Sequence, residues 1–349
     1  MNEGLAVLVP NYPYFRLAAQ VTYKFRKTIH DLIIIVPVRR ILYQTIDICR
    51  WFNNRLDILI TNNGTNNIGL FFGYDPGAFQ KSIQYSTDFR PLSIALADLN
   101  NDNYLDFVTA NYGPNTIGIF YGLSNGTFNK QIIYSTGLSS GPNAVNSDDL
   151  DNDNYIDIVV ANSILNNIGI FFNHGNGTFN KQITFSTGFY SRPYSLVVND
   201  LNNDGILGII TANRHSDTID ILIGFGDRSF ANVLTYKTGS YYTPYSINIG
   251  NFNNHNQSDI VVANRDVNKI SIFLGFGNGT FANLTTYLTG SIPCSTPIDY
   301  LNNDQYLDIV ISNSNSNNIS IVFGYSDGTF TKQITCSTGI NSNPYCSYK

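Results

Sequence analysis

Short apolar runs with the alternation of β-strands recur along the chain, separated by runs of Asn, Asp and Gly. Residues 142–190 illustrate one unit: extended runs follow Pro142 and cover 157–161, 167–172 and 179–186, and a tight Asn-Gly turn precedes the last of them. Val, Ile and Phe are frequent in these runs, and such residues favour strands. The pattern therefore predicts four short strands in about 50 residues.

The same unit repeats with a nearly constant period. Three kinds of position mark it: a proline before the first run, an Asp or Gly at the start of the second, and a phenylalanine after each tight turn. The prolines are Pro91, Pro142, Pro193, Pro244, Pro293 and Pro344. The second runs start at Asp57, Asp106, Asp157, Gly208, Asp259 and Asp308, and the phenylalanines are Phe79, Phe128, Phe179, Phe230, Phe281 and Phe330. All spacings are 49 to 51 residues, and three markers in step indicate a true repeat.

Four short strands in about 50 residues are typical of a β-propeller blade. We therefore predict an all-β fold, a β-propeller of four-stranded blades. A calcium-binding nonapeptide solenoid or another β-helix would need a far shorter period, so these alternatives are weak.

The number of blades depends on the first 56 residues, whose motifs are poor. Counting back one period places strand-like runs at 18–24, 30–38 and 42–49, so a degenerate extra blade fits. We predict seven blades, with six as the alternative if residues 1–41 form an unrelated basic leader. The expected units are 42–90, 91–141, 142–192, 193–243, 244–292 and 293–343. A closing strand at 344–349 would complete the ring and remove its open edge.

Composition supports a folded chain and limits its partners. The 349 residues are 43% hydrophobic and 13% charged. Residues 1–55 carry eight Lys/Arg against three acidic residues, a net +5, which leaves −10 for the remainder of a chain with net charge −5. An acidic body argues against nucleic acid as a partner, because phosphate binding requires a basic surface. No run approaches the length of a membrane span, and no signal peptide is evident. We expect the propeller to be a monomer.

The four cysteines give little chemistry. Cys49, Cys294, Cys336 and Cys346 form no C-x-x-C pair and are too few for a disulfide framework. Cys336 and Cys346 could pair if the fold brings them together, although buried cysteines more often pack as small apolar residues.

The acidic loops are the clearest chemical signal. Asp149, Asp151, Asp153 and Asp157 lie within nine residues, directly before a strand-like run. Four carboxylates so close repel one another, and a hard cation such as Ca²⁺, which takes six to eight oxygen ligands, would relieve that repulsion. Asp and Asn are also ordinary turn formers, so a loop without metal is the alternative.

These loops, in this period, resemble the FG-GAP or VCBS repeats, of which the N-terminal propeller of integrin α-chains is a member. The resemblance covers about residues 42–349. It implies Ca²⁺ loops with side-chain ligands at positions one, three, five and nine and a carbonyl at seven. The full matches are Asp98, Asn100, Asp102 and Asp106 with Tyr104, and Asp149, Asp151, Asp153 and Asp157 with Tyr155. Weaker matches are Asp200, Asn202 and Asp204, which lack an acid at Gly208, and Asn302, Asp304 and Asp308, with Tyr300 at position one.

The remaining copies depart further from the pattern. Asn251, Asn253, His255 and Asp259 carry too little charge for a convincing metal site, and the loop before Asp57 is corrupted. A loop of this kind binds Ca²⁺ in the range found outside cells. Seven N-x-S/T sequons point the same way, although an Asn- and Thr-rich repeat produces sequons by composition. We therefore expect an extracellular or cell-surface protein.

No enzyme signature is recognisable in the sequence. His30, His174, His215 and His255 occupy unrelated points of the repeat, and the glycines fall at turns and strand centres. The preferred prediction is thus a non-catalytic, calcium-stabilised binding module for an extracellular protein or glycan, as in cell adhesion. A structural scaffold or fragment of a larger surface protein, and a propeller hydrolase or lyase, are the alternatives.

The resemblance implies that ligands contact the face opposite the calcium loops. The loops expected there differ most between copies and are rich in Tyr and Arg, which are enriched at binding hot spots. The candidate residues are Phe89, Arg90, Tyr112, Phe189, Tyr190, Arg192, Arg214, Tyr241 and Tyr242.

Overall fold

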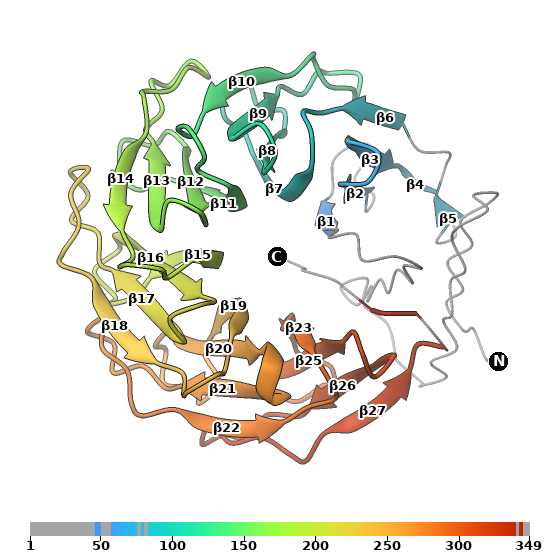
Figure 1. Ribbon diagram of the computed structural model, residues 1–349, viewed down its shortest axis with the longest axis vertical. Coiled ribbons are helices and arrows are strands. Elements are labelled where there is room, and N and C mark those ends of the chain that lie inside the picture. Colours follow the sequence, from blue (N-terminus) through green and yellow to red (C-terminus); the bar gives the residue numbers. More distant parts are fainter. Residues whose placement is uncertain (1–45, 50–56, 75–77, 80–82, 340–341, 345–349) are drawn as a thin grey trace.

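The computed structural model describes residues 46–49, 57–74, 78–79, 83–339 and 342–344. Antiparallel four-stranded sheets follow one another around a central axis (Figure 1). In each sheet the first strand lies nearest the axis and the last at the rim (Figure 1). The molecule is therefore a β-propeller, as predicted.

The blades follow the chain in order. The first contains β1 (Ile46–Cys49), β2 (Asp57–Asn62), β3 (Asn67–Phe71) and β6 (Ile83–Ser86), with a small hairpin of β4 (Gly73–Tyr74) and β5 (Ala78–Phe79). The second contains β7 (Pro91–Ala97), β8 (Asp106–Asn111), β9 (Thr116–Phe120) and β10 (Ile132–Ser135). The third contains β11 (Pro142–Asp148), β12 (Asp157–Asn162), β13 (Asn167–Phe171) and β14 (Ile183–Ser186).

The remaining blades repeat this plan. The fourth contains β15 (Pro193–Asp200), β16 (Leu207–Asn213), β17 (Thr218–Leu222) and β18 (Leu234–Lys237). The fifth contains β19 (Pro244–Gly250), β20 (Asp259–Asn264), β21 (Lys269–Phe273) and β22 (Thr285–Leu288), with a 3₁₀ turn, η1 (Arg265–Val267), after β20. The sixth contains β23 (Pro293–Ser295), β24 (Ile298–Asp299), β25 (Asp308–Asn313), β26 (Asn318–Val322) and β27 (Ile334–Ser337).

The part of the chain that the structure describes forms six four-stranded blades, the alternative number, and not the preferred seven. The expected degenerate blade falls on residues 1–41, outside the described residues. Residues 345–349 of the expected closing strand, and Cys346, lie outside them as well, so the pairing of Cys336 with Cys346 stays a prediction. The miscount arose because the strand-like runs at 18–24 and 30–38 fit the period, although they lack the proline, Asp and phenylalanine markers that recur from residue 57 on.

The repeat markers have clear structural roles. Proline opens the inner strand of the second to sixth blades, where its missing N–H is harmless because it is the first strand residue. In each of these blades the register shifts directly after the proline. The next strand starts at an Asp, except in the fourth blade, where it starts at Leu207.

The core lies between neighbouring sheets. Between the second and third blades, for example, Val108, Ile117, Val145 and Ile158 are fully buried in one cluster. Equivalent clusters lie between the first and second, third and fourth, fourth and fifth, and fifth and sixth blades. Every blade therefore needs its neighbours to bury its apolar faces.

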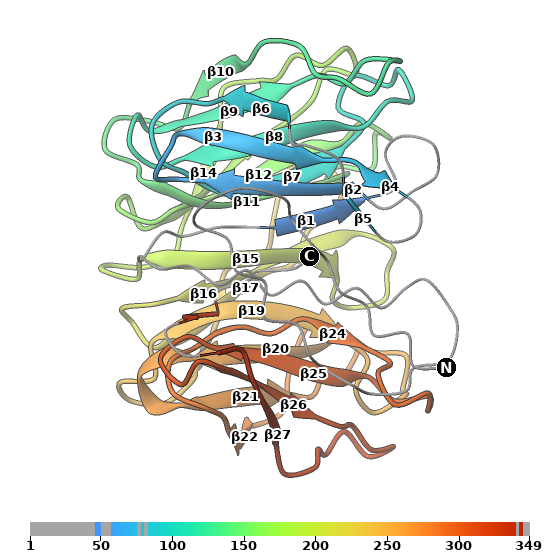
Figure 2. The same cartoon turned by 90° about the vertical axis from the view of Figure 1, so that its right-hand side faces the viewer.

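The strand order gives the ring two chemically different faces. The loops from the rim strand to the next inner strand, and those after the second strand, lie on one face. The Asp loops lie on the other, because they follow the far end of each inner strand (Figure 2). Among the described residues, no helix has the length and apolar character needed to cross a membrane.

Candidate functional site

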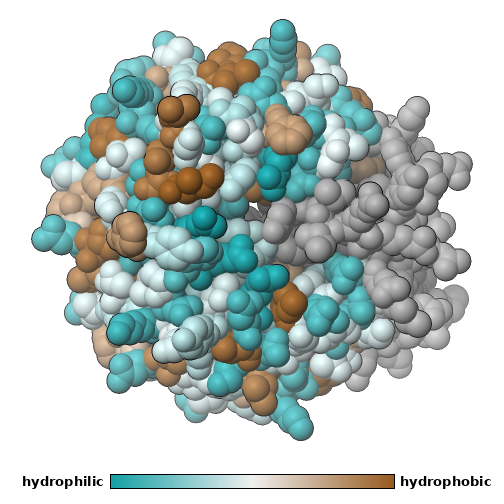
Figure 3. Space-filling model, in the orientation of Figure 1, coloured by the Kyte–Doolittle hydropathy of each residue, from teal (hydrophilic) through white to brown (hydrophobic). Residues whose placement is uncertain are grey.

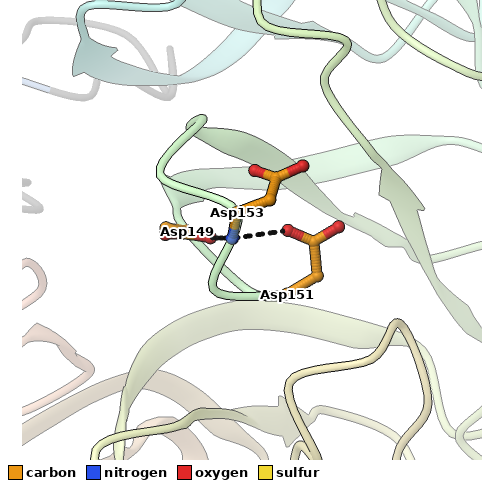
Figure 4. Close-up of side chains that lie close together, drawn as sticks. All are labelled: Asp149, Asp151 and Asp153. Carbon is orange, nitrogen blue, oxygen red and sulfur yellow. Dashed lines mark hydrogen bonds between the residues drawn. The ribbon is translucent and has the colours of Figure 1, made fainter.

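The Asp loop of the third blade gathers three carboxylates. Asp149, Asp151 and Asp153 each place one oxygen within 4.8 Å of the others (Figure 4). Oxygens of Asp149 and Asp151 both accept the backbone N–H of Asp153, at 3.2 and 3.3 Å. Asn152 and Asn154 adopt positive φ angles of 58° and 65°, which lets the loop curl around this N–H. All the available ligands are oxygens, so the loop has the chemistry of a hard-cation site.

The Asp at position nine has a different role from the rest of its loop. Asp157 is fully buried; its Oδ2 accepts the N–H of Leu150 at 3.0 Å and its Oδ1 accepts the N–H of Asn173 at 2.9 Å. The same two bonds recur at Asp106, Asp259 and Asp308. Burial raises the pKa of Asp106 and Asp157 to about 7, against the effect of these N–H groups. This carboxyl ties the Asp loop to the loop after the third strand.

The other Asp loops keep the same shape with fewer acids. In the second blade, Asp98 and Asn100 accept the N–H of Asp102, both at 3.1 Å, and Asn100 donates to Asp102 at 3.0 Å. The Asn-to-Asp bond is repeated by Asn202 with Asp204 at 2.7 Å and by Asn302 with Asp304 at 2.6 Å. Since the shape persists where acids are missing, turn chemistry alone can form these loops. The ligand roles of their side chains, and of the carbonyls of Tyr104 and Tyr155, stay predictions.

A second group of side chains lies on the opposite face, on the fourth and fifth blades. We call it the tyrosine–arginine cluster; it consists of Tyr190, Arg192, Tyr194, Arg214, His215, Tyr245 and Arg265. Two loops of the fourth blade are joined by their backbones, because Arg214 N–H donates to Arg192 O at 3.1 Å and His215 N–H to Ser191 O at 3.0 Å. The rings of Tyr190 and His215 are therefore adjacent, with centroids 4.8 Å apart.

The centre of the cluster is a pair of stacked tyrosines. The rings of Tyr194 and Tyr245 lie 4.2 Å apart, and their hydroxyls share a hydrogen bond of 2.6 Å. The guanidinium carbon of Arg214 lies 5.4 and 5.6 Å from the two ring centroids, and that of Arg265 lies 5.6 Å from the ring of Tyr245. These distances are typical of cation–π contacts, which hold both arginines over the tyrosines.

Two buried nitrogens in the cluster have unused hydrogen-bonding capacity. The Nε of Arg214 and the Nδ1 of His215 are buried and have no hydrogen-bond partner among the described residues. Burial and the nearby charges of Arg192 and Arg214 lower the pKa of His215 below its ordinary value of 6.5, and Asp217 opposes the shift. His215 is therefore neutral at pH 7, so its imidazole can accept a proton. The face of Figure 3 carries its most hydrophilic surface near the middle of the ring, by the starts of β15 and β19.

The structure brings together only part of the predicted ligand face. Tyr190, Arg192 and Arg214 belong to the cluster. Arg90 lies 4.8 Å over the ring of Tyr112 in a separate contact between other loops, and Tyr242 has Lys269 at 5.7 Å. Phe89, Phe189 and Tyr241 are exposed loop tips, with exposed fractions of 59%, 98% and 83%.

Sequence reasoning missed Tyr194, Tyr245 and Arg265, and it rejected His215 as a catalytic residue. A signal was present, because Tyr194 and Tyr245 follow the opening prolines of consecutive blades and Arg214 and Arg265 are also one period apart. Among the complete blades of the described ring, only the fourth and the fifth have a tyrosine after the opening proline and an arginine after the second strand. His215 was dismissed because it matches no position of the repeat, although a residue that departs from a repeat is a natural candidate for function.

The fold and the two faces define a repeat β-propeller with oxygen-rich loops on one face. Residues 52–109, 98–160 and 149–211 match the family model of the FG-GAP-like repeat. Over residues 52–211 the chain thus matches the FG-GAP-like repeat, the resemblance that the acidic loops predicted. No curated protein sequence matches the chain.

Solved structures with the same fold include enzymes. The periplasmic gluconolactonase of Pseudomonas aeruginosa has a TM-score of 0.68 and 12% identity over 86% of both chains. A putative 6-phosphogluconolactonase of Bacteroides fragilis has a TM-score of 0.65 and 18% identity over 86% of this chain and 85% of its own. A lectin of Agrocybe aegerita that recognises non-reducing terminal N-acetylglucosamine has a TM-score of 0.61 and 14% identity over 89% and 90%. At these identities the likeness shows the fold alone.

The prediction of a non-catalytic binding module is corrected by these structures. Those with the highest TM-scores whose names state an activity are lactonases, so this fold is one that hydrolases use. The prediction that the chain is no enzyme is likewise wrong on this comparison. It failed because a propeller active site is assembled from loops of several blades and leaves no compact motif in the sequence.

Proposed function

We propose that the tyrosine–arginine cluster is the active site of a hydrolase for small anionic sugar lactones. The observation that carries the proposal is the neutral His215, with a buried, unpartnered Nδ1, beside Arg192 and Arg214. The named lactonases and the lectin with this fold support a sugar-sized ligand. Arg192 and Arg214 favour an anionic one, whereas Arg265 is already paired with Asp266 at 3.4 Å.

The residues suit hydrolysis of a cyclic ester. Tyr194 and Tyr245 offer an aromatic surface to the apolar face of a sugar ring. His215 accepts a proton from water, whose oxygen then forms the new bond to the lactone carbonyl carbon. Arg214 donates from Nε to the carbonyl oxygen as it becomes negative. The ring C–O bond breaks, the leaving oxygen takes the proton from the imidazolium, and an open hydroxy acid results.

A proton-release assay at constant pH tests this function. We expect the purified chain to hydrolyse glucono-1,5-lactone 6-phosphate faster than buffer alone, and faster than the uncharged lactone, because arginines favour the phosphate. Arg192→Ala together with Arg214→Ala should lower kcat/KM at least tenfold, since charged hydrogen bonds contribute about 1.5–3 kcal/mol each. Arg90→Ala is the matched control, because Arg90 precedes the opening proline of another blade and also lies over a tyrosine. Rates equal to those in buffer for both lactones would refute the proposal.

We further propose that the Asp98 loop of the second blade holds a Ca²⁺ ion with a structural role. Oxygens of Asp98 and Asn100 converge on one N–H, and those of Asp98, Asn100 and Asp102 lie on an exposed loop without a competing cation among the described residues. Loops of this type are filled at extracellular calcium levels, which favours a protein that works outside the cell.

Thermal unfolding with and without calcium tests this ion. For a dissociation constant of 10⁻⁴ to 10⁻³ M, 10 mM Ca²⁺ should stabilise the fold by about 1.5–3 kcal/mol per site, relative to excess EDTA. Asp98→Asn should remove most of that gain, while Asp327→Asn, in an exposed turn, should keep it. An equal midpoint in Ca²⁺ and in EDTA would exclude the site.

A further inference from the structure

The Asp loop of the third blade differs from the others because an arginine of the next blade lies on it. Arg228, in the turn between β17 and β18, places Nε 2.5 Å from an oxygen of Asp151 and a terminal nitrogen 3.3 Å from an oxygen of Asp153. We infer that the guanidinium of Arg228 is the cation of this loop and takes the place of a divalent ion. This inference is independent of the proposed hydrolase, which concerns the opposite face.

The contact follows from the register between neighbouring blades. In each interface the turn of one blade lies beside the Asp loop of the preceding blade. A Cβ on Gly177 would lie 3.0 Å from Cβ of Asn100, and one on Gly328 would lie 3.2 Å from Cβ of Asn253. The turn residue therefore faces position three of the neighbouring loop, and Arg228 faces Asp151 in the same way.

The two charges occur together in this one interface. Position three is Asn in the other complete loops, at Asn100, Asn202, Asn253 and Asn302, and Asp only at Asp151. The turn residue is Gly at Gly126, Gly177, Gly279 and Gly328 and Arg only at Arg228. The carboxylate that distinguishes this loop from the other full match, the loop of Asp98 to Asp106, is thus the one that has an arginine opposite it.

The backbone conformation at Arg228 is unfavourable for any residue but glycine, which indicates that the contacts of its side chain compensate. Arg228 has a φ of 71°, and the glycines at this position have φ between 77° and 80°. This left-handed conformation is unfavourable for a residue with a Cβ. The guanidinium also lies 5.1 Å over the buried ring of Phe172, and the side chain of Asp151 is only 4% exposed. The Arg228 side chain itself is 43% exposed, so the pair is shielded from water on the Asp151 side only.

Bound arginine and bound calcium exclude each other here. A Ca²⁺ ion would need the oxygens of Asp151 and Asp153 that Arg228 occupies, and it would lie beside a positive charge. The third blade is consequently joined to the fourth without metal, whereas the second blade's loop faces Gly177 and stays open to an ion.

Calcium titration calorimetry of EDTA-treated protein tests the inference. Arg228→Gly introduces the residue that the same turn has in other blades, so the variant should fold. We expect it to bind one more Ca²⁺ ion per chain than the wild type, and Asp149→Ala added to Arg228→Gly should remove that ion. In EDTA the Arg228→Gly protein should melt at a lower temperature than the wild type, and Ca²⁺ should raise its Tm more than it raises the wild-type Tm.

Two results would overturn the inference. If Arg228→Gly leaves the number of bound ions unchanged, the loop has no cation site for the arginine to fill. If Asp149→Ala alone lowers the number of ions bound by the otherwise wild-type chain, calcium occupies the loop beside the arginine.

Discussion

Replacement of His215 by Gln is expected to lower kcat for lactone hydrolysis by about 10²- to 10⁴-fold, the usual contribution of a general base. Gln retains a polar side chain of similar reach but cannot take a proton from water. The backbone bond of residue 215 to Ser191 is unaffected by the change, so the loop should keep its shape. Steady-state kinetics in the proton-release assay would measure the loss.

His174→Gln is the matched control for this prediction. His174 is an exposed residue in a turn of the third blade, on the side of the ring that carries the Asp loops, so its replacement should leave kcat unchanged. The Tm of both variants should match the wild type. If the His215→Gln protein keeps kcat within threefold of the wild type, another group removes the proton and the assignment fails.

The pH profile gives a second readout of the same residue. A base is active when neutral, and since the pKa of His215 is lowered, its loss of activity in acid should begin below pH 6.5. Arg192→Gln removes one of the two charges that lower this pKa, so the acid limb should move toward higher pH. A limb that does not move would mean that another group controls it.

The fold could be predicted because each blade is a local unit whose signals lie within about 50 residues. Pro142 and Asp157 each begin a strand, β11 and β12, whereas Phe179 forms an isolated bridge with Asn173 and the run predicted from it is a strand only over β14. The blade number could not be fixed, since it depended on residues 1–56, where the same markers are missing.

The candidate sites, unlike the fold, could be predicted from the sequence only in part. The Asp loops were visible because their Asp and Asn residues are close in sequence. The pair of Arg228 with Asp151 joins residues 77 apart, and the cluster of His215 with Tyr245 joins two blades, so neither follows from local spacing. What the sequence did contain was a set of departures from the repeat, and they concentrate in the fourth blade: Gly208 for Asp, Arg228 for Gly, and Arg214 and His215 after the second strand. In a ring of similar blades, the blade that departs most is the first place to look for chemistry.

Replacement of Asp259 by Ala is expected to lower the free energy of unfolding by about 3–5 kcal/mol, since it leaves two buried N–H groups without an acceptor. Asp259 is fully buried, and its oxygens accept the N–H groups of Phe252 and Gly275, both at 2.8 Å. Its loop has Asn251, Asn253 and His255 in place of acids, so this site separates the structural role of the position-nine Asp from any effect of metal. Urea unfolding in EDTA at pH 7 would measure the change.

Two comparisons make this result specific. Asp259→Asn keeps one acceptor but points an amide donor at the other N–H. Its free energy of unfolding should therefore lie between those of the wild type and the Asp259→Ala protein. Asp266→Asn, on an exposed side chain of the same blade, should change stability by less than about 0.5 kcal/mol. In the fourth blade, where Gly208 holds this position, the carbonyl oxygen of Leu222 and the side chain of Leu201 lie 2.7 and 2.9 Å from where a Cβ would be. If Asp259→Ala costs less than about 1 kcal/mol, the buried carboxyl does not hold the blade together and its repetition at Asp106, Asp157 and Asp308 needs another cause.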